Sequence, residues 1–121
     1  MPDELDFETI FADLPKIRFP FDRSLPVRGW LVQGPRHQVA FWHSPVAYKS
    51  QEHSHPYAEW GVVITGWCDI TTPDGTRRYV AGEVFYLRPG VPHASATSDD
   101  YRSLDLFFSP HHLQSEPEEG V

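Results

Sequence analysis

The chain has 121 residues, which is enough for one domain with a core of its own but too few for a separate cofactor-binding domain. Its net charge of −7 argues against binding to nucleic acid or to an anionic membrane, because both require a basic face. The single Cys68 excludes an internal disulfide. With no signal-peptide pattern and no membrane-spanning apolar run, the sequence predicts a cytoplasmic protein.

The first predicted element is a short amphipathic helix over residues 7–14. Its apolar side chains recur at helical spacing and would share one face: Phe7, Ile10, Phe11 and Leu14. Pro15 ends this pattern, and so short a helix is not stable alone, so we expect the segment to dock on the rest of the protein. The proline-rich residues 15–27 predict an extended connector, so that residues 1–27 form an N-terminal helix and arm.

From Arg28 onward, short runs rich in β-branched and aromatic residues alternate with turns rich in Gly and Pro. These runs predict strands over residues 28–33, 37–43, 45–50, 59–72, 76–80, 84–88, 93–98 and 102–108. Within the run 59–72, Gly66 marks a turn, and Thr72-Pro73-Asp74-Gly75 is the strongest hairpin signal. About eight strands with no helix between them predict an all-β sandwich or barrel over residues 28–110, followed by an acidic tail over 111–121.

Four potential metal ligands stand at strand-like spacings. His53 and His55 are two residues apart, so on a strand both side chains point to one face, and Glu59 and His93 complete the set. Imidazole and carboxylate ligands favour a transition metal such as Zn, Fe, Ni, Cu or Mn over Mg or Ca. Four such ligands leave an octahedral metal two open positions, which a bound molecule or a reaction requires. The sequence therefore predicts a site for one divalent transition metal.

The same residues resemble the two motifs of the cupin superfamily. The first motif, Gly-x5-His-x-His-x3/4-Glu-x6-Gly, is matched from its first histidine to its closing glycine: His53, His55, Glu59 and Gly66. The second, Gly-x5-Pro-x-Gly-x2-His-x3-Asn, is matched at Gly82, Gly90 and His93. The sequence departs from the motifs at three positions, none of which is a metal ligand: Ala47 replaces the leading Gly of the first motif, and Arg88 and Thr97 replace the Pro and Asn of the second. The resemblance covers about residues 46–108 and implies a small double-stranded β-helix, or jelly-roll, barrel with one divalent Fe, Mn, Ni, Co, Cu or Zn ion.

A weaker resemblance concerns the last strand. The run Leu-Asp-Leu-Phe-Phe-Ser-Pro at 104–110 is similar to that of small cupins that linearise unsaturated uronates from pectin and alginate. It implies that Asp105 and Phe107 lie at a sugar site, although the Arg of that family is replaced here by His111. The run Glu-Trp-Gly-Val-Val at 59–63 is similar to conserved-barrel cupins with Gln-Trp-Gly-Val-Val, which implies a fold and a metal but no reaction.

These residues suggest roles around the metal. Asp105 is the candidate acid or base and Arg88 a candidate anion contact, while Tyr48, Val63 and Phe107 would line the substrate site. We expect a metal-dependent enzyme on a small polar substrate such as a sugar acid, with isomerase or lyase chemistry ahead of an O2-dependent oxygenase. The alternatives are a non-catalytic cupin that binds or senses a small ligand, and a purely structural dimerisation barrel.

Two further expectations concern the surface. The short helix and the side chains of Trp30, Trp42 and Trp60 supply more apolar surface than one small barrel can cover, so we expect a homodimer. His37 and His43 have no second ligand at a suitable spacing, so we expect surface or structural roles for them. We expect the same of His111 and His112, because they adjoin Pro110 at the start of the tail.

Overall fold

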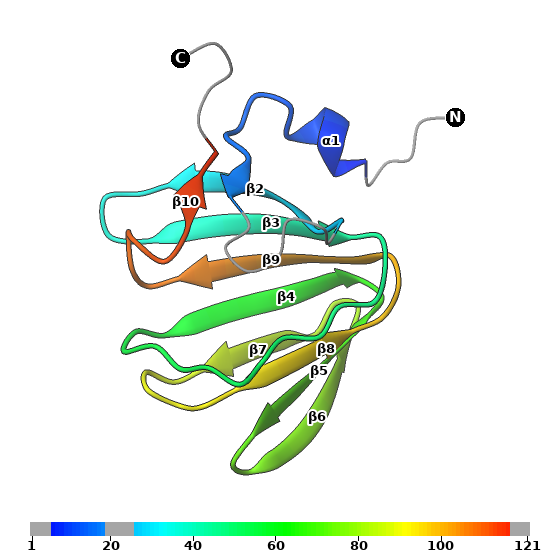
Figure 1. Ribbon diagram of the computed structural model, residues 1–121, viewed down its shortest axis with the longest axis vertical. Coiled ribbons are helices and arrows are strands. Elements are labelled where there is room, and N and C mark those ends of the chain that lie inside the picture. Colours follow the sequence, from blue (N-terminus) through cyan, green and yellow to red (C-terminus); the bar gives the residue numbers. More distant parts are fainter. Residues whose placement is uncertain (1–5, 19–25, 117–121) are drawn as a thin grey trace.

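The computed structural model describes residues 6–18 and 26–116 (Figure 1). These residues form one short helix, α1 (Phe7–Ile10), and ten strands, and every strand pairing is antiparallel. The all-β prediction with a short N-terminal helix is therefore confirmed. Among the described residues, no helix has the length and apolar character needed to cross a membrane.

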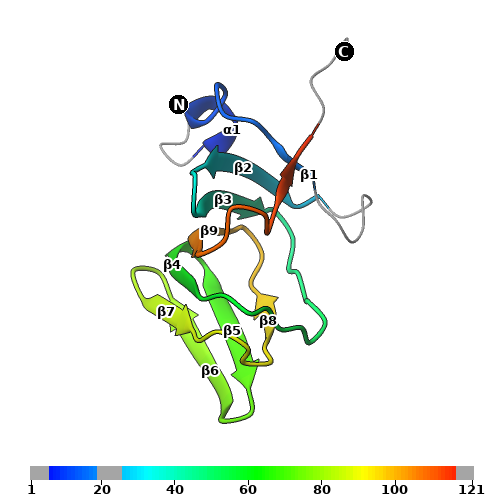
Figure 2. The same ribbon diagram turned by 90° about the vertical axis from the view of Figure 1, so that its left-hand side faces the viewer.

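The strands form two main sheets that face each other. The larger sheet has the order β2 (Arg28–Gln33), β3 (Gln38–Ser44), β9 (Tyr101–Phe107), β4 (Glu59–Thr65) and β7 (Val84–Leu87). The smaller sheet has the order β6 (Gly75–Val80), β5 (Trp67–Thr72) and β8 (Ala94–Thr97). A two-stranded sheet pairs β1 (Ile17–Arg18) with β10 (Gln114–Ser115), and it lies beside β2 (Figure 2).

One long predicted run is divided at the glycine that indicated a turn, and one predicted strand is not regular in the structure. The run 59–72 breaks into β4 and β5 at Gly66, whose φ of 79° is the left-handed conformation that glycine tolerates. The run 45–50 forms no regular strand, and only Lys49 makes a bridge, with Ala96. Its backbone still runs beside β8, because Tyr48 accepts a hydrogen bond from Thr97 and Ser50 donates one to Ser95, both at 2.8 Å.

The N-terminal helix is shorter than the predicted 7–14 but docks as expected. Beyond Ile10 the chain turns through a bond from the Leu14 N–H to the Phe11 carbonyl, because a residue before proline disfavours helical geometry. The Phe11 ring stacks on Phe41 at 4.1 Å, and Phe7 meets Trp30 edge-on at 6.2 Å. Trp30 is thus only 1% exposed, so this chain itself covers one tryptophan that we had assigned to a dimer surface.

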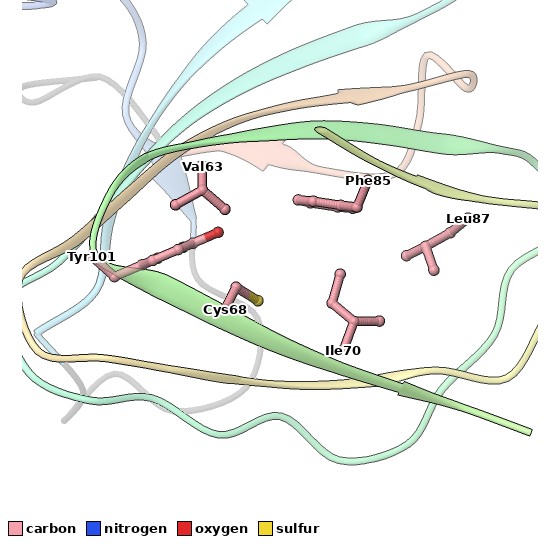
Figure 3. Close-up of a cluster of buried hydrophobic side chains, with 6 residues drawn as sticks. All are labelled: Val63, Cys68, Ile70, Phe85, Leu87 and Tyr101. Carbon is pink, nitrogen blue, oxygen red and sulfur yellow. The ribbon is translucent and has the colours of Figure 1, made fainter. Parts of the chain in front are cut away.

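The core lies between the two main sheets. Figure 3 shows Cys68 and Ile70 of β5 facing Val63 and Phe85 of the larger sheet, with Tyr101 and Leu87 at the sides. Gly61 makes this packing possible, because a Cβ at that position would lie 2.1 Å from Cζ of Phe85. Strand alternation then directs Glu59, two residues before Gly61, toward the same interior.

Candidate metal centre and adjoining cavity

Two separate segments supply the predicted ligands, and the backbone ties them together. His53 and His55 precede β4, Glu59 opens β4, and His93 precedes β8. The N–H of His53 donates to the carbonyl of His93, and the reverse bond forms too, both at 2.9 Å. Gly90, with φ of 80°, donates its N–H to the His55 carbonyl at 2.7 Å. The turn before His93 therefore sets its position against the segment that carries the other histidines.

Three of the four predicted ligands form a compact buried group. The ligand atoms of His55, Glu59 and His93 all lie within 4.8 Å of one another, and all three residues are buried. The Oε1 atom of Glu59 lies 3.3 Å from Nε2 of His55 and 3.8 Å from Nε2 of His93. Such spacing brings two imidazole nitrogens and one carboxylate oxygen to a single point, which is the ligand chemistry of a divalent transition metal.

The histidines are oriented for binding through Nε2. In each ring Nδ1 lies within hydrogen-bond distance of a backbone carbonyl two residues away: Gln51 for His53 at 2.9 Å, Tyr57 for His55 at 2.7 Å and Val91 for His93 at 3.0 Å. A ring that donates from Nδ1 keeps the lone pair on Nε2 free, which is the usual arrangement behind metal-bound histidines.

His93 gives the most direct indication that something binds here. Its Nε2 atom is buried and has no hydrogen-bond partner among the described residues. A buried polar atom without a partner costs about 1–3 kcal/mol, so native structures rarely leave one. A metal ion between His93, His55 and Glu59 would satisfy this atom, and the residues present therefore fit a metal.

His53 lies beside this group and is exposed. Its ring centroid is 4.3 Å from that of His93, in an edge-to-face arrangement, and 6.3 Å from that of His55. His53 is not one of the three residues whose ligand atoms lie within 4.8 Å of one another. Its role as a fourth ligand stays a prediction.

Asp105 lies behind Glu59 in the barrel interior. It is 9% exposed, and Ser103, which is 1% exposed, donates its Oγ hydrogen to Oδ1 of Asp105 at 3.0 Å. Burial, together with the neighbouring Glu59 charge and a hydrogen bond to Glu59, holds the pKa of Asp105 well above its ordinary value. Burial opposes ionisation of Glu59 too, but hydrogen bonds with His55 and Asp105 outweigh it, so the pKa of Glu59 is lowered. The pKa values of the two neighbouring carboxyl groups are thus shifted in opposite directions.

A cavity of about 720 Å³ opens beside the ligands and extends into the barrel. Its wall includes Asp105, Phe107 and Tyr48, three residues that the sequence had marked, together with Lys49. The other two marked residues lie elsewhere, since Val63 is fully buried in the core and Arg88 is exposed at the end of β7. The roles assigned to all five stay predictions.

His112 is the residue at this site that sequence reasoning missed. It lines the cavity, and its ring stacks on Phe107 with centroids 4.0 Å apart and planes at 18°. Its Nδ1 is hydrogen-bonded to the hydroxyl of Tyr57, whose ring stacks on His55 at 4.5 Å. Burial lowers the pKa of His112 to about 4. The only sequence signal near His112 is that the uronate-linearising cupins have an arginine at the position of the adjacent His111, which is exposed here.

Comparison with known proteins is consistent with this site. The family described as "Cupin domain" matches residues 40–106, more than half of the chain. The chain belongs to the cupin family. The cupin resemblance of its two motifs is therefore confirmed. No curated protein matches this cupin.

Several solved cupin structures share the fold. An RmlC-like cupin from Shewanella frigidimarina has 16% identity and a TM-score of 0.69, with 84% of this chain and 89% of that chain covered. KdgF from a Halomonas species has 19% identity and a TM-score of 0.63, with 71% and 80% covered. Oxalate decarboxylase from Bacillus subtilis has 19% identity and a TM-score of 0.65, with 83% and 28% covered. At such identities the similarity establishes the fold alone.

Proposed function

We propose that this cupin is a metal-dependent enzyme that acts on a small polar substrate bearing a carboxylate, with a sugar acid as the leading class. The observation that carries the proposal is the unpartnered Nε2 of His93, which faces His55 and Glu59 at the edge of a 720 Å³ cavity. A divalent transition metal bound there would polarise a carbonyl or hydroxyl oxygen of the substrate. Isomerase or lyase chemistry leads, with an O2-dependent oxygenase reaction second.

The ligands divide into a buried core and an outer member. His55, Glu59 and His93 would form the core of the site. His53 would complete the set through its exposed ring, which already lies against that of His93. Three imidazoles and one carboxylate leave open positions for a substrate oxygen on the cavity side.

In this proposal, Asp105 would exchange a proton with the substrate. Its side chain lines the cavity, and it is hydrogen-bonded to both Ser103 and Glu59, which fix its orientation. We therefore assign Asp105 as the acid or base. Phe107 and Tyr48 would form walls of the substrate site, and Lys49, which lines the cavity, would neutralise the carboxylate in preference to the more distant Arg88.

The first test is elemental analysis of the untagged protein purified without added metal. The proposal predicts about one transition metal per chain in the wild-type protein and a large loss in His55→Ala. Asp105→Asn should keep the metal but lose turnover on a panel of uronates and small hydroxy acids. The matched control Asp74→Asn, in an exposed turn, should change neither. If the wild-type protein binds members of the panel without turnover, and Asp105→Asn binds them with the same affinity, the result would support the sensing alternative instead.

We further propose that the outer face of the larger sheet forms a homodimer. One continuous apolar row crosses all five strands there, and none of its residues is fully buried: Val32, Val39, Leu106, Trp60 and Tyr86. Tyr86 is 57% exposed and Val32 is 40% exposed at the two ends of the row. An apolar row of this length on a sheet face is typical of a surface that packs against a second copy.

A further inference from the structure

The segment that follows β9 returns across the end of the barrel that carries the ligands (Figure 1). Gln38, which is fully buried, donates from Nε2 to the Leu113 carbonyl and accepts from the Leu113 N–H, both at 2.8 Å. Gln33 donates to the Pro110 carbonyl at 2.9 Å, and β10 pairs with β1. The segment between Pro110 and Leu113 is thus fixed on both sides, and His112 lies within it.

The surroundings of His112 hold its ring in one orientation. Phe107 stacks on one face, and the His55 ring meets it edge-on with centroids 5.2 Å apart. The Tyr57 hydroxyl occupies Nδ1. No hydrogen bond to Nε2 of His112 is found in the part of the chain that the structure describes, although the residue lines the cavity.

The hydrogen bond with Tyr57 sets which nitrogen carries the hydrogen. An imidazole nitrogen is a stronger acceptor than a phenol oxygen, so the Tyr57 O–H donates to Nδ1 of His112. The neutral ring must then carry its hydrogen on Nε2. His112 therefore presents an N–H donor, and the residue that carries it lines the cavity beside the metal ligands.

We propose that His112 is a further substrate-binding residue, which donates a hydrogen bond from Nε2 to an oxygen of the bound molecule. Tyr57 acts through His112 as a positioning residue, because it fixes the tautomer that donates. The inference rests on the proposed function for the class of ligand, a small hydroxy acid that also contacts the metal. This donor would add specificity that a metal and an aromatic wall do not supply, because the bound molecule must then carry a hydrogen-bond acceptor that reaches His112.

The experiment uses the Co(II)-loaded protein and glycolate, a two-carbon hydroxy acid, as the probe. Glycolate binding is followed by the visible absorption of cobalt, and metal content is measured for every variant. His112→Phe keeps the ring that stacks on Phe107 but removes the donor, and should raise the Kd for glycolate about tenfold with metal content unchanged. His112→Gln, which restores an N–H donor, should recover most of this loss. His111→Phe, the same substitution at the exposed neighbour, should have no effect.

The role of Tyr57 is tested by a double-mutant cycle. Tyr57→Phe should raise the Kd for glycolate about threefold in the wild-type background and leave it unchanged in the His112→Phe background. A merely structural role for Tyr57 would give the same change in both backgrounds and would overturn its assignment.

Other outcomes overturn the inference in distinguishable ways. An unchanged glycolate Kd in His112→Phe contradicts it directly. Loss of cobalt from His112→Phe would make His112 a metal ligand instead. A wild-type protein that binds cobalt but shows no glycolate-dependent spectrum would also reject it. Failure of the wild-type protein to bind any metal would overturn the proposed function, and this inference with it.

Discussion

His53 and His93 form an antiparallel bridge in which the N–H of each donates to the carbonyl of the other at 2.9 Å. The two cupin motifs are therefore joined by backbone groups, independently of the side chains that would bind a metal. Replacing either imidazole leaves this link intact, so the loss of metal can be measured without loss of the local fold.

The unpartnered Nε2 of His93 leads to a prediction about stability. Added metal should stabilise the wild-type protein by about 2.7 kcal/mol at a concentration of one hundred times its Kd, because metal binds the folded state alone. His93→Ala should abolish this gain, whereas His53→Ala should reduce it less, since His53 is exposed. Thermal melts with and without Zn(II) or Co(II) measure the effect, with the exposed His37→Ala as control. A metal-dependent gain that persists in His93→Ala would contradict the assigned site.

The buried amide of Gln38 should contribute strongly to stability. Gln38→Leu fills a similar volume but leaves the buried N–H and carbonyl of Leu113 without partners, so we expect a loss of about 2 kcal/mol in the free energy of unfolding. Gln33→Leu removes the bond to Pro110 and the bond that Gln38 Nε2 donates to Gln33 Oε1, but it leaves both bonds between Gln38 and Leu113 in place, so we expect a smaller loss of about 1 kcal/mol. Urea denaturation measures both values. Equal losses would show that the two glutamines contribute alike.

The apolar row on the larger sheet predicts the behaviour of a charged variant. Tyr86→Lys places a cation in the proposed dimer surface and should shift the protein toward the monomer. Val80→Lys, at a residue that is 48% exposed on the smaller sheet, should leave the oligomeric state unchanged. Gel filtration with light scattering at micromolar concentration distinguishes these results. A wild-type monomer at all concentrations tested would reject the dimer.

Asp100 predicts a small, one-sided dependence of stability on pH. A hydrogen bond from His43, and a weaker contribution from Arg102, lower the pKa of Asp100 from 3.8. A carboxyl whose pKa is lowered on folding stabilises the protein above its unfolded pKa, and the contribution is lost as pH falls through the folded pKa. Asp100→Asn, which tolerates the φ of 52° at this position, should therefore destabilise the protein at neutral pH but not near pH 2.

The magnitude should stay below about 1 kcal/mol, because the Asp100 side chain is 67% exposed and solvent screens its interactions. Denaturation of the wild-type and Asp100→Asn proteins at neutral and acidic pH measures the difference. A variant that is equally destabilised at both ends of the range would indicate a backbone effect instead.

The sequence predicts the features that local patterns encode. Glycine at 66 breaks the long apolar run because a turn there needs a positive φ. The spacing of His55, Glu59 and His93 predicts the compact ligand group because strand geometry and turn chemistry are short-range properties. For Asp105, the resemblance of the run 104–110 implies a place at the site, and the structure buries this residue in the barrel interior.

What the sequence does not reveal depends on contacts between distant residues. Gln38 binds Leu113 across 75 positions, and nothing near either residue signals the pairing. This contact, together with the bond from Gln33 to Pro110, holds the segment that carries His112 beside the cavity. The acidic residues that follow His112 in the sequence predict a tail instead. The irregular run 45–50 also depends on distant residues, because its backbone makes only a few hydrogen bonds to β8 and forms no regular strand.

The packing of Phe85 against Gly61 has a consequence for engineering. Phe85 lines the cavity and occupies the space that any side chain at position 61 would need. The two positions therefore share one fixed volume, and a methyl group added at 61 must be matched by a smaller residue at 85. Exchanges within this pair, such as Gly61→Ala with Phe85→Leu, would reshape the floor of the cavity while every metal-binding and hydrogen-bonding group stays in place.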